Sequence, residues 1–173
     1  MDTSHVSDLS ASELPEVRIV PATRADLPAV LTFVRELAAY ERSPAEVVAT
    51  EADFDAALFG QRPVAEAIIA WIGHERVGFA LFFHNFSTWT GRRGLYLEDL
   101  YVRASARGHG VGRALLAALA RTAVERGCPR LEWVALDWNA PAIAFYSAIG
   151  ARRLEDWETF RLEGDAVRKL ATP

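Results

Sequence analysis

Three glycines within six residues constrain the fold of this chain more than any other feature of its sequence. The run RGHGVG occupies residues 107–112, after a β-like segment, and a strongly helical pattern begins at Val111. Glycine lets a backbone approach a ligand closely and leaves its amide N–H groups unshielded. Because these amides lie at the start of a long helix, its dipole and unpaired donors favour an anion. The run predicts a loop that holds a diphosphate, with Arg107 adding positive charge.

A glycine loop by itself does not identify its ligand. A dinucleotide loop of the GxGxxG type needs a different placement of its strand and acidic residue, and the GxxxxGK[ST] pattern is absent from the chain. The alternative to a ligand-binding loop is a turn whose glycines are required only by the packing of the chain. The rest of the sequence has to decide between a turn of this kind and a diphosphate loop.

Hydrophobic periodicity predicts a mixed, mostly antiparallel sheet covered by helices, which is an α+β (α/β layered) domain. The three middle strands are expected to pair antiparallel, because short turns connect them. Capping boxes at Thr23 with Asp26 and at Thr50 with Asp53 predict two helix starts. The expected strands are 17–20, 64–72, 77–86, 94–103, 131–136 and 160–162, and the expected helices are 27–41, a short one between 50 and 60, 111–126 and 141–149.

Length and charge narrow the class of protein. With 173 residues, the chain fits one domain, expected over 17–173, after a flexible Ser- and Asp-rich tail over 1–16. A net charge of −4 and a pI near 5.6 argue against nucleic-acid binding through backbone electrostatics. The same acidity agrees with a cationic small-molecule substrate, although many cytoplasmic proteins share it.

The single cysteine and the hydropathy exclude further classes. Cys128 has no partner for an internal disulfide, and it lies between Gly127 and Pro129 in an expected turn without a base at motif spacing, so we expect a structural thiol. No metal site is expected. No run approaches the roughly 18 apolar residues of a membrane helix, and the N-terminus lacks signal-peptide regions. The sequence therefore predicts a cytoplasmic protein.

Three segments resemble one known family. They are FHNFSTWTGRRGLYLEDLYV, RGHGVGRALL and DWNAPAIAFYSAIGA. The second resembles the CoA-pyrophosphate loop of the GNAT superfamily of N-acetyltransferases. LYLEDLYV together with WNxPxxxFY resembles the diamine (spermidine/spermine-type) branch, including its thialysine-acetylating relatives. The similarity runs over 17–161 and implies the GNAT fold, with the glycine loop opening the central helix, and acetyl transfer from acetyl-CoA to a primary amine of a small cationic substrate.

The resemblance also implies a set of site residues. Main-chain groups of Leu100, Tyr101 and Val102 should face the pantetheine arm, and the loop from Arg107 through Gly108, His109, Gly110, Val111, Gly112 and Arg113 should hold the pyrophosphate. Asn139 resembles a CoA-contacting asparagine, and Tyr146 lies at the position of the tyrosine near the CoA sulfur. The pocket for the amine should be lined by Tyr40, Glu41, Glu98, Asp99 and Glu158, the last on a looser alignment.

The chemistry gives two of these residues a role. An aliphatic amine has a pKa of about 10.4, so its neutral form is scarce at pH 7, and deprotonation costs about 4–5 kcal/mol. Glu98 is the expected base, directly or through water, and Tyr146 is the expected acid for the departing thiolate. Backbone donors can stabilise the oxyanion. Adjacent strand residues face opposite ways, so Glu98 and Asp99 can share one pocket only across a β-bulge; otherwise one is a solvated surface carboxylate.

Several of these residues could instead be purely structural. Tyr146 could belong to the core, and Tyr40 and Glu41 could be surface residues at a helix end. His109 is expected to be exposed beside the ligand, and His84 to be a core or interface histidine, since no partner lies at metal spacing. The aromatic residues of the second middle strand and the following turn are expected in the core and at a dimer surface. They are Phe79, Phe82, Phe83, Phe86 and Trp89.

Two rival functions remain open. The acceptor could be another amine, such as an amino acid or a protein lysine. The chain could instead be a non-catalytic module that only binds CoA, although Glu98, Asn139 and Tyr146 are all present. The family resemblance further implies a homodimer. The sequence does not rank diamines, polyamines and thialysine as acceptors.

Overall fold

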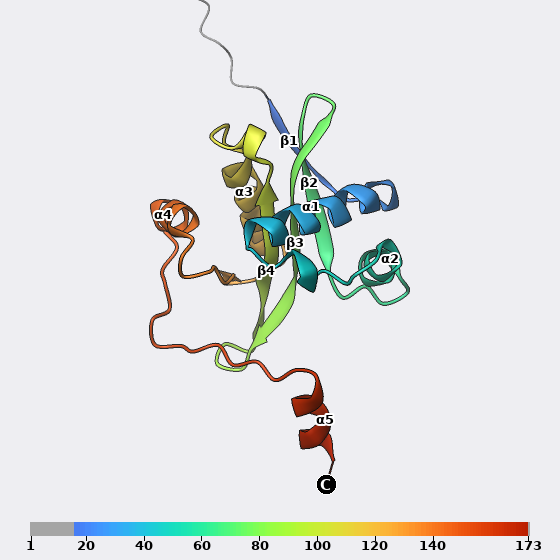
Figure 1. Ribbon diagram of the computed structural model, residues 1–173. Helices are drawn as coiled ribbons and strands as arrows, with labels where there is room; N and C mark the ends of the chain where they lie inside the picture. Colours follow the sequence, from blue (N-terminus) through green and yellow to red (C-terminus); the bar gives the residue numbers. More distant parts are fainter. Residues whose placement is uncertain (1–15, 173) are drawn as a thin grey trace, which may run out of the picture. The chain divides into compact units, whose positions relative to one another are not determined.

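The computed structural model describes residues 16–172, and a five-stranded sheet lies at its centre (Figure 1). The strand order is β1-β2-β3-β4-β5, with antiparallel pairing except between β4 and β5, which run parallel. The strands are β1 Val17–Pro21, β2 Glu66–Ile72, β3 Glu75–Ser87, β4 Arg92–Val102 and β5 Leu131–Glu132. The expected mixed, mostly antiparallel sheet is confirmed.

The chain divides into two compact units. The first ends at Val134 and holds the whole sheet, and the second begins at Ala135 and holds the last two helices. The first unit contains η1 Arg24–Asp26, α1 Leu27–Tyr40, η2 Pro44–Glu46, α2 Glu51–Phe59, η3 Ala104–Ala106 and α3 Val111–Glu125. The second contains α4 Ala140–Ala148 and α5 Asp165–Ala171.

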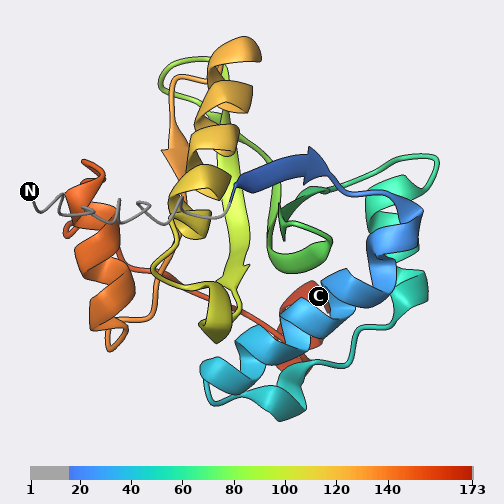
Figure 2. The same cartoon turned by 90° about the horizontal axis from the view of Figure 1, so that it is seen from above.

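Helices cover both faces of the sheet in the first unit (Figures 1 and 2). On one face Phe33 of α1 stacks on Phe79 of β3, with ring centroids 5.6 Å apart. The other face carries α3, whose Leu115 and Leu119 are fully buried. Phe79 and Phe82 lie three residues apart in β3 and therefore face opposite ways. Both are buried, so the sheet is a layer between two apolar cores.

Both predicted capping boxes form. Thr50 Oγ1 accepts a bond of 3.3 Å from the Asp53 amide, while Asp53 accepts from Thr50 N at 2.8 Å. Asp26 accepts from Thr23 N at 2.8 Å and from Thr23 Oγ1 at 2.7 Å. These bonds fix where η1 and α2 begin, as local sequence chemistry predicted.

Asp26 also holds a long-range ion pair. Its Oδ1 lies 2.8 Å from Arg76 Nε at the start of β3, and the residue is only 5% exposed. Burial by itself raises the pKa of Asp26, but hydrogen bonds from Thr23 and the charge and hydrogen bond of Arg76 outweigh it and lower the pKa. The start of α1 is thereby anchored to the sheet.

The end of α3 explains the lone cysteine. The Cys128 amide donates to Ala123 O at 2.8 Å across Gly127, whose φ of +66° places it in the left-handed region. This arrangement closes the helix as a Schellman-type cap. Cys128 is 7% exposed, in keeping with the expected structural thiol.

A polar cluster attaches β5 to its neighbours. Glu132 accepts from Asn85 Nδ2 at 2.8 Å and lies 3.0 Å from Arg130 Nε. A Cβ on Gly94 would come within 2.4 Å of Asn85 Oδ1 and 2.8 Å of Arg130 Nε. Gly94 therefore leaves the space in which β3, β4 and the start of β5 meet.

Two strand predictions are wrong. The expected buried strand over 131–136 is only the two half-buried residues of β5, and Val134 is 65% exposed. The expected strand over 160–162 is irregular, with Phe160 and Leu162 exposed. A strand needs a neighbour for its backbone groups, and no pairing beyond the five strands occurs within residues 16–172.

One helix was not predicted. It is α5, which begins after Gly164 with Asp165 in its first turn and Arg168 and Lys169 in its last. An acidic residue at the start of a helix and basic residues at its end both favour the helix dipole, so this charge pattern was the available signal.

We expect Asp26→Asn to lower the free energy of unfolding by about 2 kcal/mol at pH 7, because a nearly buried, hydrogen-bonded charge is lost. The folded-state pKa of Asp26 is lowered, so its contribution is present above 3.8 and is lost as the pH falls through the lowered value. The difference between the two proteins should shrink below pH ~4.

Urea unfolding at several pH values measures this difference. The control is Asp55→Asn, which removes an exposed ion pair of 2.7 Å with Arg24 and should cost less than about 1 kcal/mol. Equal losses for the two variants at pH 7 would contradict the anchoring role of Asp26.

Candidate active site

The glycine loop has the open geometry that the sequence predicted. Gly108 and Gly110 have φ values of +81° and +77°, and a Cβ on either would meet no atom within 4 Å. The Ala114 amide makes the first bond of the helix, to Gly110 O at 2.9 Å. The preceding amides of the first turn of α3 therefore have no acceptor within the helix. An anion above this loop meets several N–H donors and the positive end of a helix of 15 residues.

The strand before the loop separates from its parallel neighbour. β4 pairs with β5 only at Leu95 and Tyr96, although β4 continues to Val102. The following part of β4, which includes Leu100 and Tyr101, is paired with β3 alone. Main-chain groups along this edge are thus available to a ligand that lies beside β4, with one exception: Val102 O already accepts a bond of 2.9 Å from Arg107 Nε.

A β-bulge in β4 brings the two central carboxylates together. Leu81 of β3 faces Asp99, and the next residue, Phe82, faces Leu97, so Glu98 is the extra residue of β4. A bulge lets two consecutive side chains project to the same side of a sheet. The negative charge of Glu98 raises the pKa of both Asp99 and Tyr96.

The charges of three carboxylates influence one another near this bulge. Burial, together with the negative charges of Glu98 and Glu41, raises the pKa of Asp99 to about 6. Burial also raises the pKa of Glu41, which follows the last residue of α1. We call Glu41, Glu98 and Asp99 the acidic cluster. Like charges in a half-buried site repel, so a cation bound there would relieve the repulsion.

Tyr40 lies between the acidic cluster and the glycine loop. It ends α1, immediately before Glu41, and its ring centroid lies 4.8 Å from the guanidinium carbon of Arg107. The same carbon lies 5.8 Å from the Tyr101 ring. The first unit contains most of the site residues predicted from the sequence. They are Tyr40, Glu41, Glu98, Asp99 and the residues of the glycine loop.

Tyr96 and Glu132 were not named from the sequence, although they border the cluster. They face each other across the β4–β5 pair, and burial, Glu98 and Glu132 raise the pKa of Tyr96. The Tyr96 ring lies 5.1 Å from that of Phe83. Tyr96 lies two residues before Glu98, and side chains two residues apart in a strand lie on the same face of the sheet. This spacing was the sequence signal that could have predicted Tyr96 beside Glu98.

Three expected site residues belong to the second unit. Asn139 caps α4, with its Oδ1 accepting from the Ala142 amide at 3.4 Å. Tyr146 is half-buried on α4, with its ring 5.5 Å from that of Phe145. Glu158 is exposed in an irregular segment. Their roles toward CoA and amine remain predictions.

The two histidines singled out from the sequence differ. His109 is exposed in the loop, and its Nδ1 lies 3.0 Å from Arg107 O. His84 is half-buried on β3, and burial followed by the charges of Arg126 and Arg93 lowers its pKa. No group of three or more potential metal ligands occurs among residues 16–172. In the same part of the chain no helix has the length and hydrophobicity to cross a membrane.

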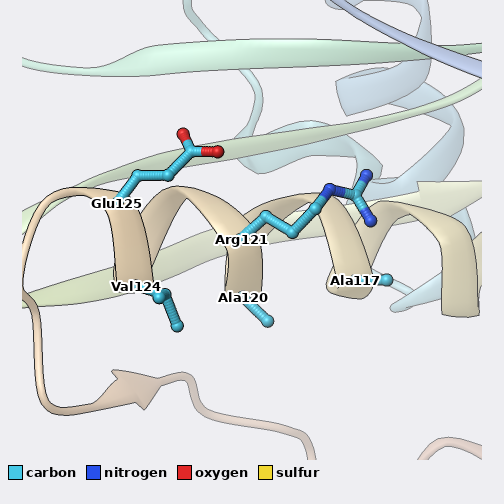
Figure 3. Close-up of a pocket in the computed structure, with 5 residues that line it drawn as sticks. All are labelled: Ala117, Ala120, Arg121, Val124 and Glu125. Atoms are coloured by element: carbon cyan, nitrogen blue, oxygen red, sulfur yellow. The ribbon is translucent and has the colours of Figure 1, made fainter.

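A hollow on α3 lies apart from this chemistry. It is lined by Ala117, Ala120, Arg121, Val124 and Glu125, all from one helix (Figure 3). Its surface is mostly apolar, with Arg121 and Glu125 as the charged residues that line it. The acidic cluster and the glycine loop therefore make the better candidate site.

Comparison with known proteins gives the family. The acetyltransferase (GNAT) family model matches residues 32–151. The thialysine N-epsilon-acetyltransferase of Sus scrofa is 37% identical over 169 residues, which covers 91% of this chain and 99% of that protein. The L-ornithine N5-acetyltransferase of Arabidopsis thaliana is 29% identical over 198 residues, covering 88% and 87%. An integron cassette protein from the mobile metagenome of V. cholerae superposes with a TM-score of 0.76 at 30% identity, covering 91% and 98%.

The chain belongs to the GNAT family of acetyltransferases. It is an acyltransferase of the N-acetyltransferase type, with the α+β fold of that family and acetyl-CoA as its cosubstrate. The glycine loop and the free edge of β4 are the features of this structure that suit a CoA ester.

We expect Asp99 to titrate near pH 6, because burial and the charges of Glu98 and Glu41 disfavour its ionised form. Glu41→Gln and Glu98→Gln should each lower the pKa of Asp99, since each removes one negative neighbour. Carbon-13 NMR of the side-chain carboxyl groups measures the titration.

Glu125→Gln is the matched control, because Glu125 is exposed on α3 and is not among the charges that act on Asp99. An Asp99 that titrates near 4 in the unchanged protein would show that the cluster is not assembled as described.

Proposed function

We propose that the enzyme transfers acetyl from acetyl-CoA to a primary amine of a small cationic acceptor that carries a second ammonium group, such as a diamine, polyamine or thialysine-like amino acid. The observation that carries this proposal is the bulge of β4, which places Glu98 beside Asp99 where the charges of Glu98 and Glu41 both act on Asp99, in the same unit as a glycine loop suited to a diphosphate. A neutral acceptor would leave these carboxylates without compensation.

The cluster has more carboxylates than a single amine needs. One can take the proton of the reacting ammonium while the others attract a second positive charge. Hydrogen bonds to charged groups contribute about 1.5–3 kcal/mol each, which is enough to distinguish a diamine from a monoamine. Relatives of the chain are named for thialysine and for ornithine, which each carry two amino groups, and this supports the class.

Glu98 is the proposed base. It is the extra residue at the bulge and is exposed, so its carboxylate can take a proton from the amine directly or through water and pass it to solvent. The neutral amine then attacks the thioester carbonyl and the C–N bond forms. The C–S bond breaks as the thiolate leaves, and the nitrogen loses its second proton to solvent, which yields the neutral amide. Main-chain donors near the loop can stabilise the oxyanion of the tetrahedral intermediate.

Tyr146 is the proposed acid for the departing thiolate. A thiol has a pKa of about 8.5, so a tyrosine hydroxyl within hydrogen-bond reach can deliver its proton to the sulfur. The proposal assigns Asn139 and the main chain of Leu100, Tyr101 and Val102 to CoA, and Glu158 to the amine. Family membership supports the assignments to CoA, because these positions lie in motifs of the family, whereas Glu158 rests on a looser alignment and lies beyond the matched residues 32–151.

Two further features belong to the proposal. We propose a homodimer that acts in the cytoplasm. Exposed apolar side chains on the β3–β4 hairpin support a contact with a second copy, since Phe86 is 63% and Trp89 87% exposed. Residues 17–173 are proposed as one acetyltransferase domain, while the proposed tail over 1–16 lies almost wholly outside the described residues.

The acceptor class is tested by thiol release from acetyl-CoA. The panel contains putrescine, spermidine, spermine, thialysine, ornithine and lysine, with butylamine as a monoamine of matched length and a lysine-containing peptide for the protein-lysine alternative. We expect kcat/KM for the best acceptor with two amino groups to exceed that of butylamine by at least about tenfold. Glu41→Gln should remove most of that preference while leaving butylamine unchanged.

Equal kcat/KM values for butylamine and for the best acceptor with two amino groups would contradict the second cation subsite. Tight acetyl-CoA binding without turnover of any amine would favour the non-catalytic CoA-binding module. Glu46→Gln, which changes an exposed carboxylate near the same helix end, is the control for Glu41→Gln.

We expect Glu98→Gln to lower kcat/KM for the amine about a hundredfold at pH 7, because proton transfer loses its acceptor. The loss should be greatest at low pH and small near pH ~10, where much of the amine is already neutral. Steady-state rates across this pH range measure the profile. A variant with the profile of the unchanged enzyme would remove Glu98 from the role of base.

A further inference from the structure

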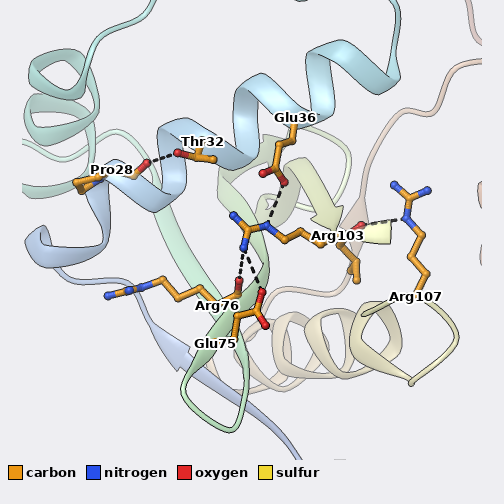
Figure 4. A network of polar contacts seen from close by, with 8 residues as sticks. Pro28, Thr32, Glu36, Glu75, Arg76, Arg103 and Arg107 are labelled. Atoms are coloured by element: carbon orange, nitrogen blue, oxygen red, sulfur yellow. Dashed lines mark hydrogen bonds and ion pairs between the residues drawn. The ribbon is translucent and has the colours of Figure 1, made fainter. Parts of the chain in front are cut away.

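Arg107 begins the glycine loop, but its side chain is engaged with the sheet and with α1. Its Nε donates to Val102 O at 2.9 Å, at the end of β4 (Figure 4). Its guanidinium carbon lies 4.8 Å from the Tyr40 ring centroid and 5.8 Å from that of Tyr101. A planar guanidinium near two phenol rings makes cation–π contacts that a flexible ammonium does not reproduce.

The end of α1 is attached to β4 at two levels. One turn before Tyr40, Glu36 Oε2 lies 3.3 Å from Arg103 Nε (Figure 4). Arg103 in turn donates to Arg76 O at 3.3 Å. Because Glu36 and Tyr40 are four residues apart, they lie on the same side of α1. Arg107 supplies the second attachment, at the last residue of the helix.

The position of Tyr40 determines where Glu41 lies. Glu41 follows Tyr40, and its amide still donates to Leu37 O at 2.9 Å, so it extends the helix by one residue. The chain then turns sharply: Arg42 has a φ of 66°, and the Ser43 amide closes the helix end on Ala38 O at 2.9 Å. Glu41 therefore has little freedom of its own, and the place of its carboxylate depends on what holds Tyr40.

We propose that Arg107 is a positioning residue for the amine acceptor: through Tyr40 it holds Glu41 in place at the end of α1. This role replaces the expectation that its side chain chiefly adds charge to the pyrophosphate loop. Arg107 therefore connects the cosubstrate side of the site with the acceptor side. It begins the glycine loop expected to bind the cosubstrate, and it also holds the helix end that carries Glu41. The inference about catalysis rests on the proposed function of the acidic cluster.

Two substitutions separate positioning from phosphate binding. Arg107→Lys keeps the positive charge but loses the Nε donor and the planar stacking group, and Arg107→Gln loses the charge as well. Positioning predicts that both raise the KM of a two-amine acceptor about tenfold while the Kd of acetyl-CoA, measured by calorimetry, changes less than about twofold. Phosphate binding predicts a normal lysine variant and a glutamine variant whose Kd for acetyl-CoA rises about tenfold; that result would overturn the proposal.

Hydrogen exchange gives a readout that does not need turnover. The Arg42 and Ser43 amides close α1 on Ala39 O and Ala38 O, at 3.2 and 2.9 Å. They should exchange about tenfold faster in Arg107→Lys and in Tyr40→Leu, with no further increase when the two are combined. Arg121→Lys, on the exposed side of α3, is the matched control and should leave exchange, KM and Kd unchanged.

The two hypotheses fail in different ways. A wild-type enzyme that acetylates no amine of the panel would overturn the proposed function, while faster exchange in Arg107→Lys would still support the attachment of α1. Unchanged exchange at Arg42 and Ser43 in Arg107→Lys would overturn the positioning role even in an active enzyme.

Discussion

The extra residue at Glu98 changes which side chains of β4 face which layer. Before the bulge, Leu95 and Leu97 pack toward α3, and after it Asp99 and Tyr101 face α1. Without the extra residue, Leu97 and Asp99 would lie on the same face, and a carboxylate would be forced into the leucine-rich core under α3. The bulge thus keeps two apolar layers intact while it brings charge to the region between α1 and the sheet.

The scaffold around the acidic cluster has its own electrostatic support. Arg76, Arg103 and Arg107 each attach α1 or η1 to a strand or to the segment that follows one. The hydrogen bonds and ion pairs of these arginines hold α1 and η1 against the sheet. They therefore keep in place the elements that repulsion among Glu41, Glu98 and Asp99 would push apart. A site with three carboxylates that influence one another needs such a frame, because its own charges act to separate the elements that carry them.

Local chemistry made much of the fold predictable. The capping boxes predicted where η1 and α2 begin, and the glycines predicted the loop and the end of α3. Apolar residues at helical spacing predicted α1 and α3. The failures have a common cause, since strands depend on partners far away in the sequence. Nothing near Trp133 indicates that β5 ends at Glu132, and Phe160 alternates with polar neighbours without a strand to pair with.

The candidate site shows the same division. The residue types of the loop and of Glu98 and Asp99 were evident from the sequence, but the bulge that unites them is a property of the β3–β4 register. The contribution of Tyr96 and the direction of the Arg107 side chain also follow only from packing. Side-chain chemistry identified the participants, and the pairing of distant segments decided how they meet.

Acetylation changes the charge of the acceptor, and this gives the acidic cluster a second consequence. An ammonium group enters the site as a cation, whereas the amide that leaves is neutral. The attraction exerted by Glu41, Glu98 and Asp99 therefore falls once the reacting nitrogen has lost its proton, and the amide that forms does not regain the positive charge. Under the proposed reaction, the same charges that collect the acceptor favour release of its product, so the enzyme discriminates against rebinding what it has made.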